Sequence, residues 1–370
     1  MTITEDGRNI DREVATLRGE ASGMQARHPS KARSLGPSTL ADIEQPAGAS
    51  TTYYEQPVLK APVWKAFIPA YFWVGGIAGG CMAIGAAAQL AGDKRLRSVV
   101  APARMIATGS VIVSAALLIA DLGRPARFLN MLRVFRPTSP MNMGTWILSG
   151  AGAAVTASTA LPMVGMKRAG DAAGLAAGVL GLGLASYTAV LVSSTAVPAW
   201  QHGGKQLPPL FCASAAASAA AALDLVPSTA RASAALRIFG LAGKAGELVA
   251  GHMYERALEA KGGAVVRHVR TGRAGQLMRA SRALTAASIV ASLFEYRRAS
   301  GVLALGGALA LRFGVVAAGR SSALDPRATF EPQRDRRAAR DRMRVPATLT
   351  EGTPAFGTVD ASVAPVAASV

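Results

Sequence analysis

An acid and a base stand three residues apart where a long apolar segment of the chain ends. Asp121 and Arg124 open the stretch DLGRPARFLNMLRVFRPTSPM, which separates two segments long enough to cross a membrane. Side chains at this spacing can pair in partly buried surroundings. Such a pair is a candidate for moving a proton between a bound molecule and water.

A second charged group lies inside the apolar run ALRIFGLAGKAGELVAGHMYE. Arg237, Lys244 and Glu247 follow one another at spacings of seven and three, so they lie near one stripe of a helix. Each charge at the centre of a bilayer costs about 2.5 to 3.5 kcal/mol and must face protein, water or headgroups. Two interpretations stay open, namely a helix at the membrane interface and a polar interior face that conducts protons. Arg312 presents the same choice.

Two tyrosines stand within apolar runs. Tyr71 lies in IPAYFWVGGIAGG beside Phe72 and Trp73, and these rings could line a pocket for a flat molecule. Tyr187 lies near the middle of another run, where an unpaired hydroxyl costs on the order of 1 to 3 kcal/mol. Its hydrogen-bond partner is either a neighbouring helix or the carbonyl of a ligand.

The elements that must position these residues are membrane helices. The 370 residues are 51% hydrophobic and only 17% charged, and the apolar windows have about the length of a bilayer-spanning helix. The sequence predicts an all-α, polytopic integral membrane protein of about eight transmembrane helices packed as bundles. The windows are 66–91, 105–120, 141–165, 172–202, 207–223, 232–251, 283–294 and 301–319.

Three parts follow from the composition. A polar arm, 1–55, and a polar tail, 323–370, have no apolar core and are predicted to be disordered, on either side of a membrane domain, 56–322. The net charge of +18 would suit nucleic acid in a soluble protein, but here the basic residues lie in short loops and the tail. The positive-inside rule then places both termini in the cytoplasm. We expect the chain in the plasma membrane, as a multi-pass protein.

Cysteines and histidines are too few for a metal cofactor. The two cysteines, Cys81 and Cys212, form no CxxC pair, so no iron–sulfur cluster is expected in this chain. His28, His202 and His268 are predicted in loops or in the arm, and His252 is the one histidine that could touch a helix end, which argues against a haem held by two histidines and against a zinc site.

The run from Asp121 to Leu148, DLGRPARFLNMLRVFRPTSPMNMGTWIL, resembles the signature of the NrfD family, the polysulfide-reductase-type membrane subunits. The stretches IPAYFWVGGIAGG, YTAVLVSSTAVPAW and RFGVVAAGRSSALDPRATFEPQR are similar to other helices of that family, so that the resemblance covers roughly 53–336. It implies a haem-free anchor subunit of a respiratory complex, which binds menaquinone or ubiquinone. Its partners would be a ferredoxin-like iron–sulfur subunit and commonly a molybdopterin catalytic subunit.

Under this resemblance, Asp121 is the first candidate for the proton-exchanging group, and Arg124 holds it and stabilises negative charge on the quinone. Tyr71 or Tyr187 would bond a quinone oxygen, and Glu247 would belong to a proton route. The alternatives are an ion or solute transporter lined by Lys244, Glu247 and Arg312, and a structural anchor without quinone chemistry.

Overall fold

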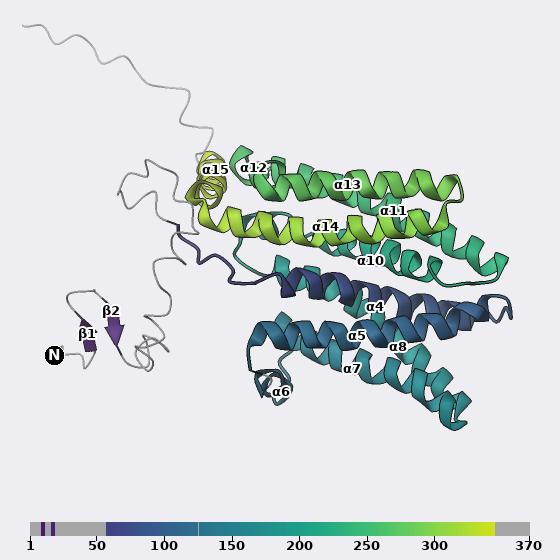
Figure 1. Cartoon of the computed structure of the whole chain (residues 1–370). Helices are drawn as coiled ribbons and strands as arrows, with labels where there is room; N and C mark the ends of the chain where they lie inside the picture. The colour runs from purple at the N-terminus through teal and green to yellow at the C-terminus, as the bar shows by residue number, and fades with distance from the viewer. Residues whose placement is uncertain (1–8, 12–15, 19–56, 125, 345–370) are drawn as a thin grey trace, which may run out of the picture. The chain divides into compact units, whose positions relative to one another are not determined.

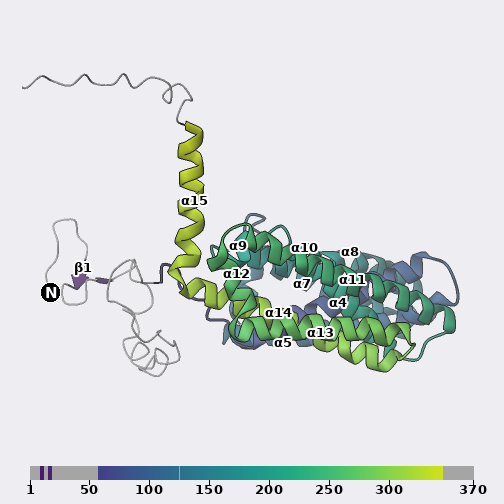
Figure 2. The same cartoon turned by 90° about the horizontal axis from the view of Figure 1, so that it is seen from above.

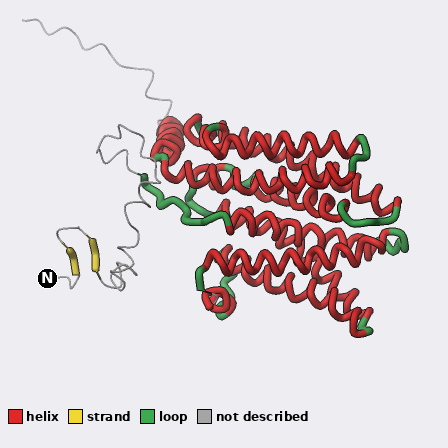
Figure 3. Tube along the Cα trace, viewed as in Figure 1, coloured by secondary structure: helices red, strands yellow, loops and turns green. Residues whose placement is uncertain are grey.

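The computed structural model describes residues 9–11, 16–18, 57–124 and 126–344. The strands β1 (Asn9–Asp11) and β2 (Thr16–Arg18) pair in an antiparallel hairpin within a unit that ends at Gln56 (Figure 3). Apart from this hairpin, the arm predicted to be disordered lies outside the described residues. Pro57 begins the second unit, which contains the helices.

The long helices of the second unit run side by side (Figure 1). The predicted apolar windows fall on these helices, because an uninterrupted apolar run satisfies its backbone groups only as a helix in lipid. These helices are α4 (Phe67–Leu90), α5 (Val100–Leu122), α7 (Pro140–Ala160), α8 (Lys167–Ser193), α10 (Leu207–Asp224), α11 (Ala230–Glu259), α13 (Gly272–Leu293) and α14 (Arg297–Leu324). The window 172–202 is predicted too long, since α8 ends at Ser193 and 198–202 form a separate short helix before Gly203.

Six candidate membrane spans are long and apolar enough to cross a bilayer: Phe67–Leu90, Leu96–Leu122, Pro140–Val164, Lys167–Ser193, Leu207–Asp224 and Arg297–Leu324. The all-α, membrane-spanning class is therefore confirmed, whereas the count of eight is not. Helices α11 and α13 are less apolar than these six, since α11 carries Arg237, Lys244 and Glu247 and α13 is rich in Arg and Ser, although both lie alongside the others.

The helices form two groups that meet through α4 and α10. In the first group, α4 packs against α5 and α8, and α7 packs against α5 and α8. In the second group, α10 packs against α11 and α14, and α13 packs against α11 and α14. Since α4 also contacts α10 and α14, it is the central helix of the unit.

Two adjacent glycines let α4 approach both groups closely. A Cβ atom on Gly79 would lie 2.5 Å from the carbonyl oxygen of Gly181 in α8. A Cβ atom on Gly80 would lie 2.7 Å from the carbonyl oxygen of Ala215 in α10. Small residues allow such backbone contact in lipid, where no hydrophobic drive joins helices. The small-residue spacing of the first window thus serves helix packing, as the sequence indicates.

Short helices gather at one end of the long ones (Figures 1 and 2). They are α6 (Ala126–Leu132), α9 (Pro198–His202) and α12 (Gly263–Arg270), and α15 (Pro326–Arg344) begins there too. At the opposite end, 3₁₀ turns η3 (Leu96–Val99) and η4 (Leu161–Val164) lie in the connections. The tail is predicted to be disordered from residue 323, yet α15 is helical; 345–370 lie outside the described residues.

Candidate functional site

Asp121 and Arg124 lie where α5 ends. The helix stops at Leu122, and Gly123 adopts a left-handed conformation with φ of 70°. Arg124 is thereby carried off the helical path, so the three-residue spacing no longer brings the two side chains together. Among the described residues, these two form no ion pair, and Arg124 is exposed. The predicted pairing is not formed in this structure.

Tyr71 belongs to a buried aromatic cluster. Its ring lies 5.6 Å from that of Phe72, and Phe72 lies 6.3 Å from Phe211 in α10. Trp64 stacks on Trp200 with ring centroids 5.3 Å apart, and its edge meets Phe72. Within the described part of the chain, the Tyr71 hydroxyl is buried without a hydrogen-bond partner.

Tyr187 lies elsewhere, between α8 and α7, where its ring fills the space that a side chain at Gly144 would need. The predicted quinone ligands therefore come from different places. Asp121 and Arg124 lie at the end of α5, Tyr187 packs on α7, and Tyr71 lies beside Phe72 in the first turns of α4.

Glu247 lies in a polar core between α11, α13 and α14. Thr285 donates a hydrogen bond of 2.7 Å to the Glu247 carboxylate. One helical turn away, Lys244 donates to the hydroxyls of Ser292 and Ser300 at 2.9 and 2.7 Å. Both charged side chains are buried, so α11 does not lie free at the membrane interface. Arg237 differs, because it is at the surface and pairs with Glu295.

Arg312 extends this polar core toward α4. Its side chain is 2% exposed and lies 3.7 Å above the Phe211 ring. It donates to the Phe211 carbonyl at 3.1 Å, while its Nε and Nη1 atoms have no partner among the described residues. A buried guanidinium with unused donors is a costly arrangement, which marks this position as more than packing.

A cavity of about 510 Å³ lies at the end where the short helices gather. Its apolar wall includes Trp64, Leu277 and Phe313, and its polar wall includes His268. Exposed Lys65, Arg273 and Arg320 also line it. The volume falls in the range of small-molecule sites, and the mixture of flat apolar surface with few polar groups is typical of them.

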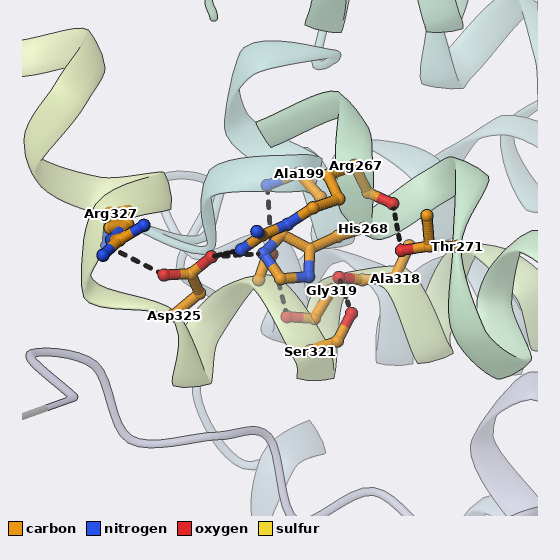
Figure 4. Close-up of polar contacts among 10 residues, drawn as sticks. Ala199, Arg267, His268, Thr271, Ala318, Gly319, Ser321, Asp325 and Arg327 are labelled. Atoms are coloured by element: carbon orange, nitrogen blue, oxygen red, sulfur yellow. Dashed lines mark hydrogen bonds and ion pairs between the residues drawn. The ribbon is translucent and has the colours of Figure 1, made fainter. Parts of the chain in front are cut away.

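Asp325, the C-cap residue of α14, contacts the side chain of His268 in the polar wall (Figure 4). Its Oδ2 atom lies 2.8 Å from Arg267 Nη2 and 2.9 Å from His268 Nε2. The Arg327 backbone donates to Oδ1 at 2.9 Å. A carboxylate at Nε2 favours the tautomer that carries its proton there. Nδ1 of His268 is then the nitrogen left for a ligand, as an acceptor.

The contact between His268 and Asp325 was not predicted from the sequence, because His268 is expected there in a loop. The residue lies in the helix α12, which has only eight residues between Gly262 at φ 117° and Gly272 at φ 60°. Periodicity is not readable over so short a length. The usable signal is Asp325 before Pro326, which is typical of a helix start.

The electrostatics of Asp325 predict a pH effect on α15. Burial alone would raise the pKa of Asp325, but hydrogen bonds from His268, the Arg327 backbone and Arg267 outweigh it and lower the pKa to about 2. A lowered carboxyl pKa stabilises the fold above its unfolded value, near 3.9, and this contribution is lost as the pH falls toward 2.

We therefore expect Asp325→Asn to speed hydrogen exchange of the first turns of α15 at pH 7. The difference between wild type and variant should shrink as the pH falls from about 4 to 2. Asp335→Asn is the matched control, because Asp335 is exposed on the same helix. Equal exchange rates in wild type and Asp325→Asn at pH 7 would contradict the anchoring role.

Residues 55–237 match the family model described as "Polysulphide reductase, NrfD". This segment belongs to the NrfD family. The resemblance drawn from sequence over roughly 53–336 is confirmed for that part, which runs from before α4 into α11. No curated protein matches the chain.

The matched segment thus resembles membrane subunits of quinone-linked oxidoreductase complexes, and the six candidate spans agree that the chain is a membrane protein. The NrfD segment includes Trp64 and Lys65 on one wall of the cavity. Other lining residues, among them His268 and Phe313, follow the segment in sequence. The cavity is thus built from the family region and the helices packed on it.

Proposed function

We propose that this protein is the haem-free membrane subunit of a respiratory complex in the plasma membrane. In this proposal it binds a quinone and exchanges electrons with an iron–sulfur partner, which commonly serves a molybdopterin catalytic subunit. The termini face the cytoplasm. The observation that carries the proposal is the cavity beside α4, in a chain of a quinone-linked membrane family.

The cavity suits a quinone ring. Trp64 and Phe313 offer flat apolar surface, and Trp64 is held in place by stacking on Trp200. Nδ1 of His268 can accept a hydrogen bond from a quinol hydroxyl, since Nε2 is engaged by Asp325. This arrangement provides orientation and a proton acceptor at a single oxygen of the ring.

Quinol oxidation releases two electrons and two protons. The electrons pass to the iron–sulfur centre of the partner. One proton goes to Nδ1 of His268, where the resulting imidazolium is stabilised by Asp325, and the other leaves to water at the exposed mouth of the cavity. In the reverse direction, the same groups return protons to a quinone. The sequence also predicts proton exchange at a second position, at Asp121 with Arg124. It predicts that Glu247 belongs to a proton route through the helix bundle.

The basic end of the helices supports partner docking there. Helix α15 carries seven arginines against three acidic residues, and it projects from the end that contains the cavity (Figure 2). Electrostatic complementarity then favours an acidic surface on the partner. Docking at this end would bring the iron–sulfur centre to the side of the quinone.

Purification of the tagged full chain from native membranes tests this function. We expect mass spectrometry to identify a stoichiometric iron–sulfur subunit, and the preparation to contain quinone and to oxidise quinol. The buried charges Lys244, Glu247 and Arg312 would equally suit an ion transporter. A chain that purifies alone and moves an ion in vesicles would establish that alternative and overturn the electron-transfer proposal.

A further inference from the structure

A second cavity, of about 820 Å³, follows the seam between α8 and α11 over the C-terminal half of α4. It differs in chemistry from the cavity at His268, because its walls are almost wholly apolar. The lining includes Ala87, Leu90, Leu175, Val179, Ala235 and Phe239. We call it the seam groove.

The seam groove lies between two helices that hardly touch one another. Helix α8 packs mainly on α4 and α7, and α11 packs mainly on α10 and α13, although both also contact α10. Val179 is 73% exposed, Leu182 62% and Phe239 44%, which leaves the groove open on its outer side. Since α4 and α8 are apolar enough to span a membrane, that side faces hydrocarbon.

The length of the groove suits part of a lipid chain. Along α4 the lining runs from Ala83 to Leu90, which is about 10 Å at 1.5 Å per residue. One leaflet contributes about 15 Å of hydrocarbon. The groove therefore accommodates the part of an acyl chain nearest its headgroup and not a whole membrane-spanning molecule.

The mouth of the groove is basic. Leu96 and Val99 close this end, and the exposed Lys94, Arg95 and Arg97 stand beside them. On the α11 side, Arg231 lies next to the lining residue Ala232 and pairs with Asp93 at 2.6 Å. The mouth thus holds four cations, Lys94, Arg95, Arg97 and Arg231, against one carboxylate. Basic clusters where a membrane helix leaves the bilayer attract anionic lipid headgroups.

We propose that the seam groove binds an anionic phospholipid, with an acyl chain between α8 and α11 and its phosphate at Arg95 and Arg97. Apolar walls alone would accept any chain, and the charged mouth selects the headgroup. The lipid fills the seam between the first and second helix groups. This site is independent of the quinone proposal, because no residue is shared between the two cavities.

Native mass spectrometry of the delipidated full chain tests the site, with phosphatidylglycerol and phosphatidylcholine of identical acyl chains as probes. We expect phosphatidylglycerol to bind more tightly by about tenfold. The double variant Arg95→Gln, Arg97→Gln should remove this preference. Arg298→Gln, at an exposed arginine of the same end in α14, should keep it.

Filling the groove tests the acyl-chain contact. The double variant Ala87→Trp, Ala235→Trp should lower binding of both lipids, whereas Ala116→Trp on the exposed face of α5 should not. Equal affinity of the wild type for the two lipids would overturn the proposal. An unchanged preference for phosphatidylglycerol in the arginine variant would also overturn it. The arginine variant alters only exposed side chains, so its result holds even where the tryptophan variant fails to fold. Displacement of phosphatidylglycerol by an uncharged long-chain quinone would assign the groove to the quinone tail and refute the lipid site.

Discussion

Replacing Gly79 by valine is expected to destabilise the membrane domain by about 3 kcal/mol, the upper range for overpacking a tight interface. Even a Cβ atom at this position would lie 2.5 Å from the Gly181 oxygen and 2.8 Å from the Ala185 nitrogen. Both are backbone atoms, so no side chain can move aside. Helices α4 and α8 must separate, and the contacts that α4 makes with its other neighbours shift with it.

The measurement is the unfolding midpoint of the purified protein in detergent, by circular dichroism against temperature or added SDS. Gly109→Val is the matched control, because Gly109 lies on the exposed side of α5, where a Cβ atom would have no neighbour within 4 Å. Equal midpoints for the two valine variants would show that α4 and α8 do not pack backbone to backbone.

Replacing His268 by alanine is expected to lower quinol oxidation by the intact complex by about 100-fold, the lower end for loss of a general base. The reason is the loss of Nδ1 as the proton acceptor, since Asp325 holds the other ring nitrogen. His252→Ala, at an exposed histidine of α11, should leave turnover unchanged.

A second comparison separates the cavity from the site predicted from sequence. Asp121→Asn alters the end of α5, which does not line the cavity. If quinol is oxidised in the cavity, turnover falls in His268→Ala much more than in Asp121→Asn. The reverse order of effects would place the reaction at Asp121 and Arg124. Asp325→Asn should also lower turnover, because it removes the carboxylate that holds Nε2 of His268.

The helices were predictable from sequence because each depends on a local property. An apolar run such as 66–91 has the length of a bilayer and must be helical in lipid, and α4 occupies Phe67–Leu90. The close approach of α4 to its neighbours also follows from a local pattern, the paired glycines. The burial of Lys244 and Glu247 on one side of α11 follows from their spacing, and only the choice between lipid interface and protein interior needed the structure.

The cavity was not predictable, because its walls meet only after folding. Trp64 precedes α4, His268 lies in α12, and Phe313 lies in α14. No spacing rule joins positions separated by whole membrane helices. The pairing expected between Asp121 and Arg124 failed for the opposite reason. It extrapolated a helical spacing beyond Gly123, where the left-handed backbone ends the helix.

The polar core of α11 constrains how the protein is made. Helices α11 and α13 are too polar to partition singly from the insertion machinery into lipid, whereas Lys244 and Glu247 are satisfied by hydroxyls that belong to α13 and α14. We therefore expect these three helices to enter the bilayer together, once α14 has been synthesised, whereas the apolar helices α4 to α8 can enter one after another.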